Sequence, residues 1–109
     1  MENLFQSRPA RAAVFAKERM GKAALFEGAQ MRVGLNAFEP GQEHAAHAHA
    51  GVDKLYCVLE GSGEFAVGDV RQRVAAGGAV FAPAGVPHGV RNESGERLVV
   101  LVAMAPPPR

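Results

Sequence analysis

The stretch LYCVLEGSGEFAVGDVRQRVAAGG (residues 55–78) decides the fold class. It consists of three short segments with apolar or alternating character, which end at Gly61-Ser62-Gly63, Gly68-Asp69 and Gly77-Gly78. Glycine-bearing turns between short β-prone segments are typical of β-hairpins. The stretch therefore predicts consecutive short strands joined by tight turns.

The flanking segments extend this pattern in both directions. In residues 31–39 (MRVGLNAFE), apolar side chains alternate with Arg32 and Asn36, and Pro40-Gly41 follows as a turn signal. Residues 97–104 (RLVVLVAM) are apolar at successive positions, which predicts a strand buried on both faces. Residues 8–28 fit a helix or edge strands equally well. Turn signals every 8–12 residues predict an all-β sandwich or small barrel of about eight to ten strands.

Length and composition limit the class of protein. A chain of 109 residues and 11.5 kDa forms one domain. Its net charge of +1 argues against a nucleic-acid-binding surface, and we expect no nucleic-acid partner. The single Cys57 favours a reducing compartment. No apolar run reaches the roughly 18 residues of a membrane span, and none resembles a signal peptide, so we expect a cytoplasmic protein without membrane contact.

Histidine is the residue type that indicates chemistry. Three of the four histidines lie in HAAHAH (residues 44–49), and the fourth is His88. His47 and His49 are two apart, so a strand would place both on one face, whereas His44 would lie on the other face or at the rim. Neutral imidazole is a common ligand of divalent transition metals. The spacing predicts a metal site formed by His47, His49 and His88, with coordination positions left open for water or substrate.

Two longer motifs contain these histidines. Gly41 is followed after five residues by His47-Ala48-His49 and later by Gly61. Gly77 is followed after five residues by Pro83-Ala84-Gly85, then by His88 and, after three more residues, by Asn92. The two motifs resemble those of the cupins in their order and spacing. The resemblance implies a jelly-roll-type double-stranded β-helix, often dimeric, in which His47, His49 and His88 bind Fe, Mn, Ni, Zn or Cu.

One position departs from the family pattern. Seven residues before Gly61, where the family has a metal-binding Glu, this chain has Lys54. An ammonium group at this position could prevent metal binding by repelling the ion, or it could pair with Glu43 or Asp53. It could also orient an anionic substrate or act as a nucleophilic amine. Asp53 is the alternative fourth ligand, although it is one residue out of phase and faces the other way unless a bulge intervenes.

Neighbouring residues have more limited interpretations. Tyr56 lies on the same strand face as Lys54, and it is a candidate catalytic residue or a pocket wall. Cys57 points to the opposite face, where packing is the expected role. The prolines and glycine before His88 shape the turn that directs its side chain, and Asn92 is expected to cap that hairpin.

These observations lead to one leading hypothesis and one alternative. We expect an N-terminal edge strand or arm at residues 1–20, a cupin barrel at 21–104 and a proline-rich tail at 105–109, assembled as a homodimer. The leading hypothesis is a three-His metal site acting on a small anionic or carbonyl-containing molecule, with Lys54 orienting an anionic group. The alternative is a non-catalytic module that binds a small ligand, with or without metal. Dioxygenase, isomerase, decarboxylase and lyase activities all remain open.

Overall fold

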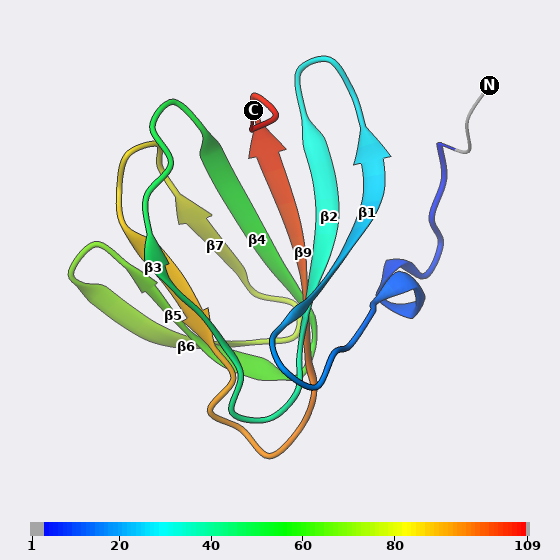
Figure 1. Cartoon of the computed structure of the whole chain (residues 1–109), viewed down its shortest axis with the longest axis vertical. Helices are drawn as coiled ribbons and strands as arrows, with labels where there is room; N and C mark the ends of the chain where they lie inside the picture. The colour runs from blue at the N-terminus through cyan, green and yellow to red at the C-terminus, as the bar shows by residue number, and fades with distance from the viewer. Residues whose placement is uncertain (1–3, 109) are drawn as a thin grey trace.

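Nine β-strands make up about half of the chain in the computed structural model, which describes residues 4–108 (Figure 1). In chain order they are β1 (Gly21–Glu27), β2 (Arg32–Phe38), β3 (Glu43–His47), β4 (Asp53–Glu60), β5 (Ser62–Val67), β6 (Val70–Ala75), β7 (Ala79–Ala82), β8 (His88–Arg91) and β9 (Leu98–Ala105). A short 3₁₀ helix, η1 (Pro9–Ala12), precedes them. The predicted all-β class is confirmed.

The strands form two antiparallel sheets that face each other (Figure 1). One sheet has the order β1-β2-β9-β4-β7, and the other has the order β3-β8-β5-β6. Strands that are distant in sequence become neighbours, so that β9 lies between β2 and β4 and β8 lies between β3 and β5. This arrangement is the double-stranded β-helix that the motif resemblance implied.

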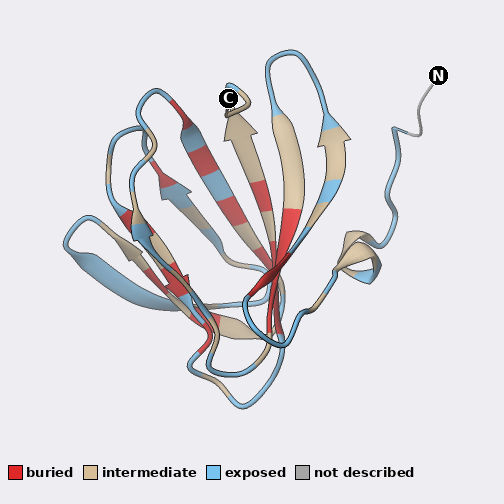
Figure 2. Ribbon diagram, viewed as in Figure 1, coloured by how far each residue is buried: buried red, intermediate tan, exposed pale blue. Residues whose placement is uncertain are grey.

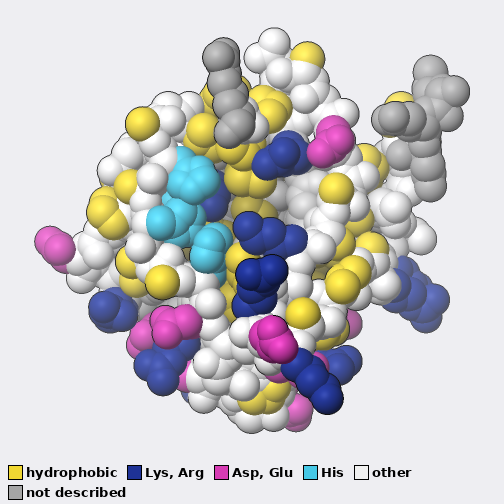
Figure 3. All heavy atoms as spheres, viewed as in Figure 1, with side chains coloured by type: hydrophobic (Ala, Val, Ile, Leu, Met, Phe, Trp, Pro, Cys, Tyr) yellow, Lys and Arg dark blue, Asp and Glu magenta, His cyan; other side chains and the backbone are white. Residues whose placement is uncertain are grey.

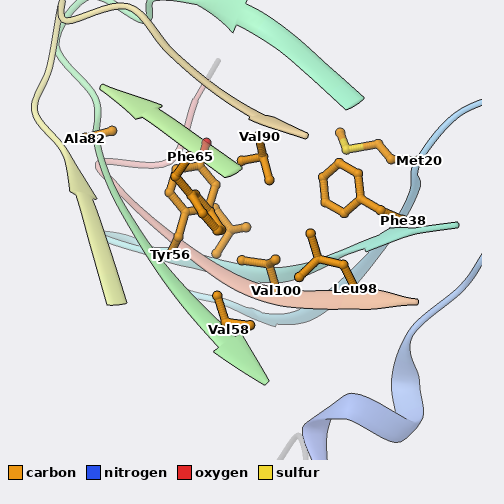
Figure 4. Close-up of a cluster of buried hydrophobic side chains, with 10 residues drawn as sticks. Met20, Phe38, Tyr56, Val58, Phe65, Ala82, Val90, Leu98 and Val100 are labelled. Atoms are coloured by element: carbon orange, nitrogen blue, oxygen red, sulfur yellow. The ribbon is translucent and has the colours of Figure 1, made fainter. Parts of the chain in front are cut away.

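The core lies between the sheets and follows from the two-residue period of the strands. Buried and exposed residues alternate along β4, as Figure 2 shows. The side chains that pack inward include Tyr56 and Phe65, whose ring centroids are 5.6 Å apart (Figure 4). The core cluster contains Met20, Phe38, Tyr56, Val58, Phe65, Ala82, Val90, Leu98, Val100 and Val102. Each large apolar side chain in it stabilises the fold by about 1.5–3 kcal/mol through burial.

Strand β9 is the centre of the larger sheet. Leu98 and Val100 belong to the core cluster. Val99, which lies between them and faces the other side of the sheet, is buried as well. The segment before β1 contributes to this burial, because η1 contacts β9 and the ring of Phe15 lies 4.1 Å from the guanidinium of Arg97. A strand that is central in its sheet and covered on both faces needs no polar residues, which explains the continuous apolar run.

Gly61 and Asn92 stabilise the turns in which they lie. Gly61 has φ of +78°, and a Cβ atom there would collide with the backbone oxygen of Arg97. Asn92 is fully buried, and its Nδ2 donates to the carbonyl oxygens of Phe38 (3.2 Å) and Glu96 (2.7 Å). The Asn92 Oδ1 accepts hydrogen bonds from the backbone N–H and hydroxyl of Ser94. No helix within residues 4–108 has the length and apolar character needed to cross a membrane.

Candidate functional site

The four histidines lie together, and we refer to His44, His47, His49 and His88 as the histidine cluster. Figure 3 shows histidine side chains gathered on one face of the molecule. Strands β3 and β8 are neighbours, and their register places His47 directly opposite His88. The ring centroid of His47 lies 4.3 Å from that of His44, 4.8 Å from that of His49 and 4.4 Å from that of His88. The His49 and His88 centroids are 6.3 Å apart. The predicted residues are therefore brought together.

The expected position of His44 was wrong. The register of β3 against β8 shifts between His44 and His47, so that three steps along β3 match two steps along β8. Such a bulge inserts one residue and returns His44 to the face that carries His47. His44 lies opposite the buried Val90 and stacks on the ring of His47. The site therefore contains four imidazoles, where the sequence predicted three.

His49 reaches the cluster by a different route from the one predicted. Strand β3 ends at His47, and His49 lies in the following loop, so a shared strand face does not bring the two together. The loop is held in place by Gly85, whose backbone N–H donates to the His49 carbonyl oxygen at 3.0 Å. This bond links the HAAHAH segment to the turn that precedes His88.

Two backbone hydrogen bonds orient the rings that face each other. His47 Nδ1 lies 2.9 Å from the carbonyl oxygen of Ala45, and His88 Nδ1 lies 2.9 Å from that of Val86. A carbonyl oxygen only accepts, so each neutral ring carries its proton on Nδ1 and keeps a lone pair on Nε2. Metal-binding histidines are commonly oriented in this way. The His88 Nε2 atom is buried and has no hydrogen-bond partner among the described residues.

Lys54 enters the cluster from β4. Its side chain points into the barrel with a relative exposure of 4%, and its Nζ lies 3.2 Å from His47 Nε2. Among residues 4–108 it forms no ion pair, which contradicts one of the alternatives considered from the sequence, pairing with Glu43 or Asp53. Asp53 faces away from the cluster and accepts a 2.8 Å hydrogen bond from the backbone N–H of Ala84. Asp53 therefore supports the turn before His88 and does not complete the site.

Tyr56 follows Lys54 by two residues and lies on the same, inward face of β4. Its ring centroid is 6.1 Å from that of His88 and 6.0 Å from the Lys54 Nζ. Burial raises the pKa of the Tyr56 phenol, so it stays protonated at neutral pH. Its hydroxyl is buried without a partner in the described part of the chain, as are His44 Nδ1 and His88 Nε2. Three unpaired polar atoms in one place are unfavourable, and a bound polar group would satisfy them.

Burial and nearby positive charge favour the neutral imidazole at His44, His49 and His88. Burial lowers the pKa of His44 to about 4, and the neighbouring His47 and Lys54 add to the effect. The pKa values of His49 and His88 are also lowered, first by burial and then by Lys54. The pKa of Lys54 is lowered by burial and by the nearby Lys22. Neutral imidazole is the form that binds metals and accepts hydrogen bonds.

A cavity of about 370 Å³ extends from the cluster toward β1 and β2. Its lining includes His44, His49 and Lys54, and also Lys22, Arg32 and Asn36 from β1 and β2. Figure 3 shows the histidines and the basic side chains facing each other across a strip of hydrophobic side chains. Lys22 and Arg32 were not predicted as site residues from the sequence. The available signal was the polar face formed by Arg32 and Asn36 in an otherwise apolar strand.

The donor chemistry fits the divalent metal that the family resemblance implies, with one obstacle. The Nε2 atoms of His47 and His88 are free of backbone partners, and His49 adds a third imidazole beside them. The obstacle is the Lys54 ammonium, which lies within hydrogen-bonding distance of His47 Nε2. Within residues 4–108, no three His, Cys, Asp or Glu side chains have atoms already placed to hold an ion. Metal binding therefore requires the Lys54 side chain to turn away from His47.

Acidification is expected to destabilise the metal-free protein partly through His44. Its pKa is about 4 in the folded chain against an ordinary value of 6.5, so the stability that neutral His44 contributes is complete above pH 6.5. This stability is lost as the pH falls toward 4, because the unfolded chain binds the proton first. Water screens this partly buried ring, which reduces the effect. When the pH falls from 7.5 to 5, we expect the free energy of unfolding of His44→Gln to decrease by about 1 kcal/mol less than that of the wild type. Urea unfolding in EDTA measures both losses, and equal losses would contradict this assignment.

Comparisons with known proteins agree with the fold and the motifs. Residues 34–104 match the family model described as Cupin domain. The crystal structure of TT1209 from Thermus thermophilus is 45% identical, with a TM-score of 0.87 over 90% of this chain and 93% of that one. A cupin-like structure from Desulfovibrio desulfuricans, described as "rmlc-like", is 30% identical, with a TM-score of 0.84 over 97% and 100% of the two chains. SCO3923 from Streptomyces coelicolor is 40% identical over 77 residues, which are 71% of each chain.

Proposed function

Because this chain belongs to the cupin family, we propose that it binds a small anionic or carbonyl-containing molecule in its barrel beside a divalent transition metal. His47, His49 and His88 are the proposed metal ligands, and Lys54 and Tyr56 are the proposed contacts to the bound molecule. The supporting observation is the set of buried polar atoms without partners among the described residues: His44 Nδ1, Tyr56 Oη and His88 Nε2. Native proteins rarely leave several such atoms unsatisfied in one place, so a ligand is expected there.

Each residue has a role that follows from its chemistry. A bound ion would supply Lewis acidity or bind oxygen. The backbone bonds to Ala45 and Val86 hold the His47 and His88 rings in the tautomer that presents Nε2 to the barrel. The Lys54 ammonium, once displaced from His47, donates hydrogen bonds to an anionic or carbonyl oxygen. The neutral Tyr56 hydroxyl donates to the same molecule from the barrel floor.

Metal titration is the experiment that tests the proposal. After removal of metal with EDTA, the protein is expected to bind about one Zn²⁺ or Mn²⁺ per chain at pH 7.5. At pH 5 the affinity is expected to fall at least about tenfold, because ligand imidazoles must lose their protons to bind. Competition with a chromophoric chelator measures both affinities. An affinity that does not change with pH would contradict histidine ligation.

The alternative function is a non-catalytic module that binds a small ligand without metal. The observation in its favour is the Lys54 ammonium at His47 Nε2, where it takes the hydrogen-bonding position that an ion would need. The same titration distinguishes the two functions, since this alternative predicts no metal binding at either pH. The cytoplasmic location and the absence of a nucleic-acid partner stay predictions.

For the assembly, we propose a homodimer formed through the outer face of the larger sheet. Leu55 and Phe81 face each other across β4 and β7 with relative exposures of 40% and 54%. Adjacent exposed apolar side chains of this size favour association. Phe81→Lys is therefore expected to convert a dimer to a monomer in size-exclusion chromatography with light scattering. Val70→Lys, at an exposed apolar position on β6 in the other sheet, is the control and should remain dimeric.

A further inference from the structure

The cavity has a second group of basic residues that the family motifs do not contain. Lys22 on β1 and Arg32 on β2 line the same cavity as His44, His49 and Lys54, and we call these two residues the rim cations. Neither makes an ion pair or a side-chain hydrogen bond within the described part of the chain. Basic side chains without partners on a cavity wall are available to a ligand.

The sheet register explains why the rim cations and Lys54 face the same space. Arg32 lies opposite Met104 in the pairing of β2 with β9, and Lys54 lies opposite the same Met104 in the pairing of β4 with β9. Residues directly opposite each other share a sheet face, so Arg32 and Lys54 point the same way with backbones about 10 Å apart. Lys22 lies opposite Asn36 on the same face, two residues along β1 from Ala24.

The space between these cations is open because small residues lie among them. Ala24 and Gly34 are paired between the Lys22 and Arg32 positions, and both line the cavity. A larger side chain at Ala24 would fill part of this volume, whereas a Cβ atom at Gly34 would collide with the backbone oxygen of Ala23.

The charge of the lining is positive. Lys22, Arg32 and Lys54 are three formal cations against one carboxylate, Glu27, which leaves a net formal charge of +2 with neutral histidines. Glu27 lies opposite Arg32 in the register, but the two do not form an ion pair. A cavity with this excess of positive charge attracts and concentrates small anions.

We propose that the cavity is selective for small dianions, with one anionic group beside Lys54 and the histidine cluster and the other held by Lys22 and Arg32. This inference rests on the proposed small-molecule function and narrows its ligand to one chemical class. Dicarboxylates and phosphate share the required chemistry. Lys54 on β4 and the rim cations on β1 and β2 are on separate strands, so a dicarboxylate, which carries its two charges on separate groups, fits them better than phosphate, which carries both charges on one group.

Calorimetric titration of the EDTA-treated protein at pH 7.5 and low ionic strength tests the proposal, with malonate, succinate, inorganic phosphate and neutral malonamide as probes. We expect a dicarboxylate to bind more tightly than phosphate and malonamide not to bind. Lys22→Gln and Arg32→Gln are each expected to weaken dicarboxylate binding about tenfold, as loss of a charge-assisted hydrogen bond predicts. Glu27→Gln removes the opposing carboxylate and is expected to strengthen binding about threefold.

Matched controls are exposed cations outside the cavity. Lys17→Gln and Arg11→Gln, which lie before β1, should leave dicarboxylate affinity within about twofold of the wild type. The proposal is overturned if the Lys22 and Arg32 variants bind like these controls, or if malonamide binds as tightly as malonate. Tighter binding of phosphate than of either dicarboxylate would overturn the dicarboxylate preference. All titrations are made without metal, so a failure of metal binding is a separate result.

Discussion

His88→Ala is expected to weaken Zn²⁺ binding at least about 100-fold, because it removes one of three proposed ligands from a site that offers few donors. His88 is buried at the start of β8, and its Nε2 has no partner among the described residues. Alanine there leaves a small cavity, which costs about 1–3 kcal/mol, so the barrel should stay folded. Chelator competition at pH 7.5 measures the affinity, and circular dichroism with thermal unfolding checks the fold.

His44 offers a matched control for this experiment. It lies in the same cluster, stacks on His47 and is not among the proposed ligands. His44→Ala should therefore keep Zn²⁺ affinity within about threefold. If His44→Ala loses as much affinity as His88→Ala, the bulge in β3 has created a ligand that the motif does not include. If His88→Ala fails to fold, the role of His88 is structural and the proposed ligand set is wrong.

Lys54→Glu is expected to raise Zn²⁺ or Mn²⁺ affinity at least about tenfold, a gain that requires only about 1.4 kcal/mol. Lys54 already points into the barrel and touches His47, so a carboxylate there replaces a repelling cation with an attracting oxygen ligand. At an effective dielectric of 20, two unit charges a few ångströms apart interact by about 4 kcal/mol, more than the required gain. Titration of both proteins with each metal measures the difference.

Lys54→Met separates the effect of removing the positive charge from the effect of adding an oxygen ligand. It removes the charge without adding an oxygen ligand, so its metal affinity should lie between those of the wild type and Lys54→Glu. Malonate affinity should fall in both variants, because each removes a cation from the cavity lining. Equal, measurable metal affinity in all three proteins would contradict the proposed site, because it would show that the ion binds away from Lys54; the metal-free binding module predicts no metal binding in the wild type.

The strands were predictable because their signals are local. Alternation in residues 31–37 and the continuous apolar run of 97–104 correspond to β2 and β9. Glycines mark the turns on both sides of β5 and after β6. Segment 8–28 was ambiguous, since its apolar clusters follow neither period clearly, and it contains a 3₁₀ turn and then β1.

The site was predictable in part. The register places His47 opposite His88, and Lys54 and Tyr56 share the inner face of β4. His44 was assigned to the wrong face because a bulge is not visible in spacing alone. His49 was assigned to a strand that ends two residues earlier. The rim cations were missed because they lie outside both motifs, on strands whose inner face depends on the pairing of β1 and β2.

By itself, the sequence determined the all-β class, the positions of most strands, the family and the residues from which a histidine site is built. Hydrophobic period, turn residues and motif spacing are properties of neighbours along the chain, so they can be read without a structure. Only the tertiary structure decided that four imidazoles meet, that Lys54 contacts His47, and that Lys22 and Arg32 line the same cavity. These outcomes depend on the bulge in β3 and on the pairing of β9 with β2 and β4, which joins segments that lie far apart in sequence.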